Sequence, residues 1–192
     1  LALSDAESAL LEKEKKKRKS PQKYVRGIFA GGTFCYQSQQ IFQDSGLQTC
    51  SNTPINKQMK LPDPDTSMEH TMVDMGDDRY TVTKPHPMID GTYRKIRILR
   101  ECRDPETAVL LLDIILGYNA SPDPVGDIIE AIVEAKRLAR DRGAHLCVAA
   151  SVCGTDDDFQ DKALQTGTLE KAGVIVFGSN AKAALFCSML VK

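Results

Sequence analysis

The sequence predicts an α/β fold, a doubly wound parallel sheet of about five strands with helices on both faces. Residues 108–116 are an apolar run in which only Asp113 is polar, which is typical of a strand covered on both faces. Residues 124–142 have the apolar spacing of an amphipathic helix, and a second apolar run follows at 146–152. Because strand and helix patterns alternate from residue 24 onward, we expect parallel strands joined by helices. About five strands are typical of the flavodoxin-like version of this fold.

The first 23 residues are expected to form a helix and a basic linker outside the domain, which spans residues 24–192. Residues 1–19 carry apolar side chains on one helical stripe. Ser20-Pro21 ends this helix, because proline disfavours helical geometry in the residue before it. The run from Lys13 to Lys19 holds five Lys and one Arg against Glu14. It is interpreted as a solvated linker, with a phosphate-binding tail as the alternative.

Within the domain, turn residues such as Gly31-Gly32 and Asp104-Pro105 mark where the regular patterns stop. Short β-rich or apolar runs predict strands at residues 24–30, 71–75, 108–116, 146–152 and 174–177, with a further extended segment at 79–83. Helical patterns follow at residues 34–44, 92–102, 124–142, 158–171 and 181–190. Residues 48–69 contain three prolines among polar residues and are predicted to be a long loop.

Composition excludes several classes of protein. The 192 residues are enough for one domain with a substantial core and a short appendage. The formal net charge of −1 gives no support for binding nucleic acid or an anionic membrane. No apolar run approaches the ~18 residues of a membrane span, and residues 1–18 lack the apolar core of a secretion signal. The six cysteines form no C-x-x-C pair, which indicates reduced thiols and a cytoplasmic protein.

Four of the predicted strand-end loops are rich in small residues, and each precedes a helix. In a doubly wound sheet such loops meet at the edge formed by the carboxyl ends of the strands, where ligands bind. Helix starts offer unpaired N–H groups and the positive end of the helix dipole, so a phosphate or carboxylate is the expected small ligand. The predicted anion-binding residues are Gly31, Gly32, Thr33, Gly117, Asn119, Asp123, Gly154, Thr155, Ser179 and Asn180.

The alternative is that these small residues only make tight turns, capped by the protein's own side chains. Asp123 stands before Pro124, as an N-cap would before a proline in the first helical turn. Asp156, Asp157 and Asp158 also lie near a predicted helix start. Carboxylates in such positions occupy the place of an anionic ligand themselves. The sequence leaves both interpretations open.

His86 is the candidate catalytic residue. Pro85 and Pro87 stiffen the extended backbone on both sides of it and exclude a helix. An imidazole titrates near neutral pH, so it can bind an anion or carry a proton. A purely structural histidine is the alternative. No metal site is expected, because no familiar ligand spacing is matched by His70, Asp74, Asp77 and Asp78.

The sequence contains no phosphate-binding P-loop, no G-x-G-x-x-G fingerprint and no G-x-S-x-G nucleophile elbow. Its distinctive segments are VRGIFAGGT at residues 25–33, VDMGDD at 73–78, PHPMID at 85–90, Leu111-Leu112-Asp113 with Gly117, Pro122-Asp123-Pro124, and Gly154-Thr155. Together they resemble the last domain of FdrA-type proteins, an acyl-CoA synthetase-like family. The resemblance covers nearly all of residues 24–190, and the HPMID stretch makes it specific.

The FdrA family is similar in turn to succinyl-CoA synthetase, and the order of loops here resembles the carboxy-terminal, flavodoxin-like domain of its β subunit. The resemblance implies that two such domains meet, each aiming a helix start at a phosphate carried by a histidine. The helix near Asp123-Pro124 would be the phosphate-facing one, with Gly31-Gly32-Thr33 beside it. A small anionic substrate, CoA-binding or α-type domains of the same family, and a homo-oligomer are the implied partners.

Departures from the family pattern limit what this chain does alone. The G-H-A-G-A segment of the α subunit, the ATP-grasp domain and the CoA-binding domain have no counterpart here. We therefore expect no cofactor on this chain alone, and CoA with ATP, or carbamoyl phosphate, in the full assembly. The implied function is part of an acyl-CoA synthetase. Because family members are associated with carbamoyl transfer to oxamate in ureide and purine breakdown, a carbamoyltransferase subunit is the second interpretation. A non-catalytic assembly or regulatory module is the third.

Overall fold

The computed structural model describes all residues, 1–192. Its strands are β1 (Tyr24–Phe29), β2 (Cys50–Ser51), β3 (Thr71–Asp74), β4 (Thr107–Ile115), β5 (Cys147–Cys153) and β6 (Ile175–Phe177). All neighbours are parallel, in the order β2-β3-β1-β4-β5-β6. The predicted doubly wound parallel sheet is confirmed. It has six strands where about five were expected.

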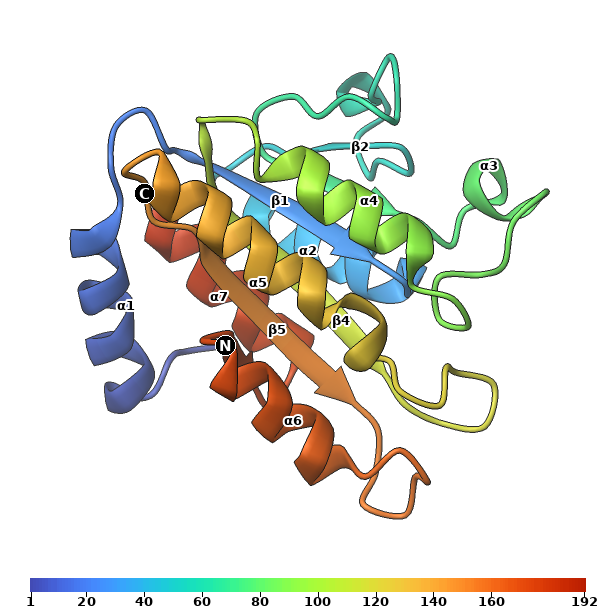
Figure 1. Cartoon of the computed structure of the whole chain (residues 1–192). Coiled ribbons are helices and arrows are strands. Elements are labelled where there is room, and N and C mark those ends of the chain that lie inside the picture. Colours follow the sequence, from blue (N-terminus) through green and yellow to red (C-terminus); the bar gives the residue numbers. More distant parts are fainter.

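Helices cover both faces of this sheet (Figure 1). One face carries α4 (Thr92–Glu101), α5 (Gly126–Asp141) and α6 (Lys162–Lys171), and the other carries α2 (Gly32–Asp44) and α7 (Asn180–Val191). Two shorter elements, η1 (Lys57–Met59) and α3 (Asp78–Thr81), lie in the connections on either side of β3. A further helix, α1 (Asp5–Lys17), packs against α7.

The sheet has a separate hydrophobic core on each face, and β4 contributes to both. Leu110 and Leu112 belong to the core under α4 and α5, whereas Val109 and Leu111 belong to the core under α2 and α7. All four side chains are fully buried. A continuous apolar run is therefore what this central strand requires, since successive side chains point to opposite faces.

Three sequence predictions were wrong in detail. The sixth strand, β2, is a two-residue edge strand inside the predicted long loop 48–69. The segment predicted as extended at 79–83 begins with the short helix α3, because Asp77 accepts a hydrogen bond from Arg79 N–H and starts a helical turn. Helix α6 begins at Lys162 and not at residue 158, because the Asp158 carboxylate closes a preceding turn by bonding Thr155 N–H.

Helix α1 is docked on the domain, and most of the basic run belongs to it. Leu11 is buried beneath this helix, and Glu14, only 6% exposed, hydrogen-bonds His145 Nε2 at 2.7 Å. Arg18, just after the helix, donates to Leu190 O at 3.0 Å. The helical lysines before Arg18 are thus the last turns of a packed helix, while the residues from Arg18 to the cis Ser20-Pro21 peptide form the connection to β1.

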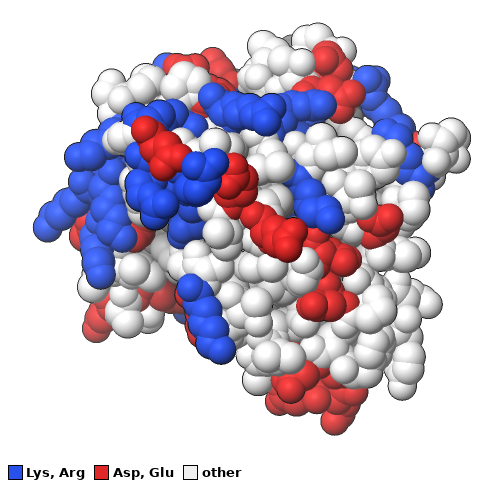
Figure 2. Space-filling view, in the orientation of Figure 1, with Lys and Arg blue, Asp and Glu red and all other residues white.

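Charge is unevenly distributed over the surface. Figure 2 shows Lys and Arg gathered on the side where α1 and the start of β1 lie. Acidic side chains gather at the lower edge of the same view, over the loop between β5 and α6. Because the strands are parallel, their carboxyl ends and this acidic loop share one edge of the sheet.

Candidate functional site at the carboxyl edge of the sheet

A topological switch point lies between β1 and β4, because the chain leaves these neighbouring strands toward opposite sides of the sheet. A buried ion pair occupies it. Asp113 in β4 is fully buried and Arg94 in α4 is 3% exposed, with Arg94 Nη2 3.0 Å from Asp113 Oδ1. The same nitrogen donates to the carbonyl oxygens of Ile28 and Asp113. Arg94 therefore joins the ends of the two central strands.

The Asp113 carboxylate also holds the loop after β1. Its Oδ1 accepts a hydrogen bond from Ala30 N–H and its Oδ2 one from Gly31 N–H, both at 2.8 Å. The Gly31 N–H is thus already bonded within the protein. The next two N–H groups, those of Gly32 and Thr33, have no acceptor in the chain. Both residues are exposed, and the first turn of α2 has neither a side-chain cap nor an acidic residue. A helix start of this kind can bind an anion.

Asp74, the last residue of β3, lies beside that helix start. A Cβ added to Gly32 would be 2.7 Å from Asp74 Oδ2, so the glycine is what allows the carboxylate to approach α2. The other oxygen, Oδ1, accepts a hydrogen bond from Gly76 N–H at 2.9 Å. Burial, followed by repulsion from Asp77 and Asp113, raises the pKa of Asp74. A second negative charge nearby would raise this pKa further and favour protonation of the carboxylate.

His86 reaches the same place from the loop between α3 and α4. A Cβ added to Gly76 would be 2.7 Å from His86 Nε2 and 3.2 Å from Asp74 Oδ1, so the imidazole and the carboxylate both approach Gly76. His86 Nδ1 accepts a hydrogen bond from Met88 N–H at 3.2 Å. This bond assigns the single proton of the neutral imidazole to Nε2, on the side of Asp74.

We call Gly32, Thr33, Asp74, Gly76 and His86 the α2 site. It combines two free backbone donors, an imidazole N–H and a carboxyl group whose pKa is raised. The donors suit a small oxyanion, because backbone N–H groups at a helix start also carry the positive end of the helix dipole. The carboxyl group and the imidazole can give a proton to such an anion or take one from it.

The start of α5 is closed by the protein's own side chains. Asp123 Oδ1 accepts hydrogen bonds from Gly126 N–H and from Gln165 Nε2, both at 2.9 Å. Gln165 Oε1 accepts one from Val125 N–H, also at 2.9 Å. Asp123 thus occupies the place that an anion would take, as the capping interpretation of this residue expects. The amides of Val125 and Gly126 are not free, so this helix start differs from the open one that the family resemblance implies.

The loops after β4 and β5 lie on the same edge and also bond within the protein. Gly117 has a φ of +124°, which only glycine adopts readily, and its N–H and C=O both bond the side chain of Gln160. Asn119 is exposed and makes no hydrogen bond. Thr155 N–H donates to Asp158 Oδ2 at 2.6 Å, and Gly154 O accepts from Lys162 Nζ at 2.8 Å.

The start of α7 is capped by Ser179 and is bonded to α2 through Asn180. Ser179 caps it by accepting a hydrogen bond from Lys182 N–H at 3.3 Å. Asn180 is 3% exposed, and its Nδ2 donates to Phe34 O and Gln37 Oε1 on α2. The structure therefore keeps Gly31, Gly32, Thr33 and Asn180 together at the start of α2, and it links His86 to them only through Gly76 and Asp74. Gly117, Asp123, Gly154, Thr155 and Ser179 bond other partners, and Asn119 bonds none.

Sequence reasoning missed Asp74, Gly76 and Arg94 as residues of this edge. Asp113 carried a visible signal, because it is the single polar residue in an apolar strand. Arg94 carried none, since basic residues alternate with apolar ones along the whole of α4, as on an ordinary surface helix. Asp74 stood out only as part of the VDMGDD segment and as one of four residues considered, and set aside, as metal ligands.

The two remaining histidines and the six cysteines form no second candidate catalytic site. His70 and His145 lie at the amino ends of β3 and β5, the opposite edge of the sheet. No group of three or more His, Cys, Asp or Glu side chains is arranged to hold a metal ion. Five of the six cysteines are buried, and Cys153 is exposed. No helix combines the length and the apolar character that crossing a membrane requires.

Comparison with known proteins gives a consistent picture. The family described as CoA-ligase matches residues 28–190. The uncharacterized protein YahF of Escherichia coli strain K12 is 42% identical over 164 residues, which cover 85% of this chain and 32% of YahF. The crystal structure of PH0766 from Pyrococcus horikoshii OT3 superposes with a TM-score of 0.53 at 13% identity, over 100% of this chain and 40% of that one, which supports the fold alone. The chain thus spans about a third of its curated relative, and it belongs to the CoA-ligase family.

Proposed function

We propose that this chain is the ligase-type domain of an FdrA-like acyl-CoA synthetase, and that it binds phosphate or an acyl phosphate at the start of α2 during acyl transfer. One observation carries this proposal. The start of α2 has exposed, unbonded N–H groups and no side-chain cap, whereas Asp123 and Gln165 bond the start of α5 and Ser179 caps the start of α7. Membership of the CoA-ligase family supports chemistry in which phosphate and acyl groups are exchanged.

Each residue of the α2 site has a role in this proposal. The N–H groups of Gly32 and Thr33 bind oxygens of the phosphate, and they cost no reorganisation because α2 already orients them. His86 Nε2–H is a further donor on the side of Gly76. Asp74 takes up a proton as the anion enters, which removes the repulsion between two negative charges and supplies an acid for the leaving oxygen.

The complete reaction requires the rest of the assembly. About two thirds of YahF lies outside the region that this chain matches. We propose that CoA-binding or α-type domains of the same family supply CoA and ATP, or carbamoyl phosphate, and that the assembly is a homo-oligomer. A phosphohistidine at His86 is a separate and less favoured hypothesis, because Nε2 would have to lose the proton with which it donates before it could attack phosphorus. It predicts labelling from γ-labelled ATP in the assembly, and labelling that is unchanged in His86→Ala would remove it.

A pair of substitutions at one residue tests the anion site itself. Gly31 has an extended conformation, φ −104° and ψ 116°, which suits the residue before a proline. Gly32→Pro removes one of the two N–H donors at the first helical position, where proline is tolerated. Gly32→Ala adds a similar Cβ next to Asp74 but keeps the N–H, so it is the matched control.

We expect Gly32→Pro to bind phosphate and acetyl phosphate roughly ten- to a hundredfold more weakly than Gly32→Ala, because a hydrogen bond to a charged group is worth ~1.5–3 kcal/mol. Isothermal titration calorimetry measures the difference, with circular dichroism as the check on folding. Equal binding by the two variants would refute a role for this amide.

The same assembly separates the alternative functions. Dependence on carbamoyl phosphate in place of succinyl-CoA would identify a carbamoyltransferase subunit. If phosphate, CoA and carbamoyl phosphate all fail to raise the melting temperature, the chain is a non-catalytic assembly or regulatory module, because a ligand that binds the native state stabilises it.

A further inference from the structure

A cavity of about 250 Å³ lies on the outer side of α4, apart from the α2 site. It opens between α4 and the segments on either side of β3. Its polar lining comes from Asp65, Tyr80, Lys84, Tyr93, Arg97 and Arg100, and its apolar lining includes the buried Met75. Three cations therefore face one carboxylate across a space large enough for a small molecule.

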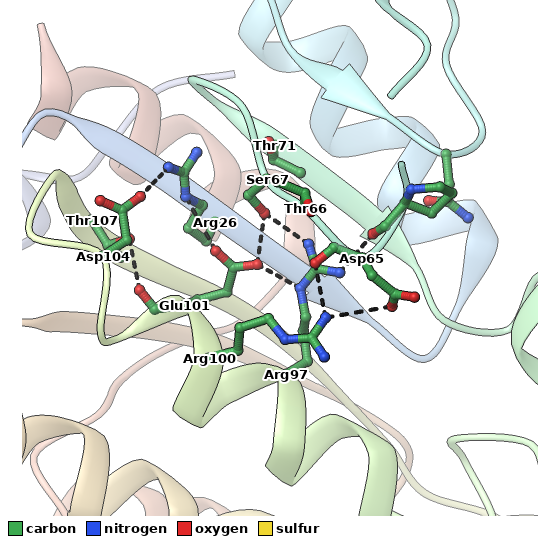
Figure 3. A network of polar contacts seen from close by, with 12 residues as sticks. Arg26, Asp65, Thr66, Ser67, Thr71, Arg97, Arg100, Glu101, Asp104 and Thr107 are labelled. Carbon is green, nitrogen blue, oxygen red and sulfur yellow. Dashed lines mark hydrogen bonds and ion pairs between the residues drawn. The ribbon is translucent and has the colours of Figure 1, made fainter. Parts of the chain in front are cut away.

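The floor of this cavity is rigid. Arg97 is 3% exposed, and its three nitrogens donate to Glu101 Oε1, Pro64 O and Ser67 Oγ. Figure 3 shows Arg97 and Arg100 extending from α4 toward the chain around Asp65, with Glu101 between Arg97 and Arg26. Because Arg97 is fixed by this network, its guanidinium group stays beside the cavity whether or not a ligand is present, with Glu101 as its ion-pair partner.

Aromatic rings line the cavity, and one of them is anchored. Tyr80 OH donates to Pro64 O at 2.9 Å, which fixes the ring of Tyr80 against the cavity wall. Lys84 Nζ lies 4.1 Å from the centroid of the Tyr93 ring, so a cation–π contact holds its ammonium group in place. The ring of Tyr80 offers a flat surface, and Tyr93 positions a charge.

Two of the cations have hydrogen-bonding capacity left. The Lys84 ammonium group makes no hydrogen bond or ion pair within the chain, although it can donate three N–H groups. Arg100 uses one nitrogen, Nη1, for a hydrogen bond to Asp65 O and an ion pair with Asp65 Oδ1 at 3.5 Å, so Nε and Nη2 stay free on a side chain that is 49% exposed. An anion at the mouth of the cavity could therefore contact Lys84 and Arg100 without displacing an existing partner from either.

We propose that this cavity is a binding site for a small planar ring that carries an anionic group, a carboxylate or a phosphate. The ring packs against Tyr80 and Met75, and the anion pairs with Lys84 and Arg100 above the fixed charge of Arg97. A ring that bears its charge at one end matches both the aromatic wall and the two cations that keep free N–H groups. The site is separate from the α2 site and does not depend on the proposed acyl transfer.

Two sets of probes test the proposal on the full chain. Benzoate and AMP each join a planar ring to an anion. Acetate and inorganic phosphate keep the anion without the ring, and benzamide and adenosine keep the ring without the charge. We expect benzoate or AMP to bind saturably and at least tenfold more tightly than its own controls. The stronger of the two distinguishes a carboxylate site from a phosphate site.

Lys84→Gln and Arg100→Gln are the test variants, and each should weaken that binding at least fivefold. Lys95→Gln, on the same helix but outside the cavity lining, is the matched control and should leave binding unchanged. Magnetic resonance contacts between the ligand ring and the Tyr80 ring report the position independently of any variant. The proposal is overturned if neither probe exceeds its controls, if Lys84→Gln and Arg100→Gln bind like Lys95→Gln, or if the ligand ring contacts no proton of Tyr80.

Discussion

The Arg94–Asp113 ion pair is where the fold and the α2 site depend on the same atoms, so Asp113→Asn is the most informative single change. Asparagine keeps one oxygen for Ala30 N–H but turns an NH₂ group toward Gly31 N–H, which loses its acceptor. It also leaves the buried guanidinium of Arg94 without its counter-charge.

The expected loss of stability follows from those two defects. An unpaired buried donor costs ~1–3 kcal/mol, and breaking a buried ion pair by removing one partner costs ~3–5 kcal/mol in total. With an m-value of about 2 kcal/mol/M in urea, the midpoint of unfolding should fall by ~1.5–2.5 M. Asp141→Asn is the matched control, because the exposed pair with Arg137 should contribute less than ~1 kcal/mol.

A second variant identifies the cause. Arg94→Met combined with Asp113→Asn no longer contains the uncompensated cation, so the double variant should lose at least ~1 kcal/mol less than the sum of the two single variants. Urea unfolding followed by circular dichroism measures all three. The reasoning is refuted if Asp113→Asn shifts the free energy of unfolding by less than ~1 kcal/mol, or if the two single effects simply add.

Three further predictions concern the response to pH. Burial would raise the pKa of Glu14, but hydrogen bonds from His145 and Lys17 outweigh this effect and lower the pKa to about 2. The free energy of unfolding should therefore fall by about 3 kcal/mol as the pH is lowered from about 4.5 to 2. Glu14→Gln should abolish that loss in urea titrations. Burial and the nearby Arg26 lower the pKa of His70 to about 4. The free energy of unfolding should therefore fall by a similar amount as the pH is lowered from about 6.5 to 4. If a His70→Gln variant shows the same fall, His70 is not the group that causes it. Because burial raises the pKa of Asp74, the ionised carboxylate destabilises the fold above that pKa. Asp74→Asn should therefore raise the melting temperature at pH 7 and strengthen phosphate binding at the same pH. Calorimetry showing weaker phosphate binding by this variant would count against the proposed protonation of Asp74.

The major elements of the fold were predictable because each carries its own signal. The strand β4 is apolar from Ala108 to Ile115 apart from Asp113, since both of its faces are buried, and α5 has one apolar face since it covers one side of the sheet. The strand β2 was not predictable, because two residues show no periodicity and their pairing with β3 depends on the surrounding loop. The start of α6 was misplaced because Asp158 looked like a helix cap and instead bonds Thr155.

The candidate site was predictable only in part, for a related reason. Local sequence shows which loops can expose amides, but it does not show which side chains will bond those amides in the folded chain. Gln165 bonds Val125 N–H and Gln160 bonds Gly117 N–H, from 40 and 43 residues away. Gln165 lies in α6 and Gln160 in the loop before it, so no pattern in the sequence around Val125 or Gly117 indicates these partners. The start of α2 stayed open because no side chain of this kind reaches it.

The charge distribution adds a constraint on how an anion reaches that helix start. Acidic side chains gather at the carboxyl edge, over the loop between β5 and α6, while Lys and Arg gather on the side of α1 (Figure 2). The long-range field therefore does not steer anions to this edge, and the affinity of the α2 site has to come from short-range donors. Short-range donors act only when they are oriented in advance, which is what the buried Asp113 carboxylate does by holding Ala30 and Gly31 immediately before Gly32. Under the proposed function, a buried ion pair at the switch point is thus a condition for binding an anion at α2, although neither of its two residues belongs to the α2 site.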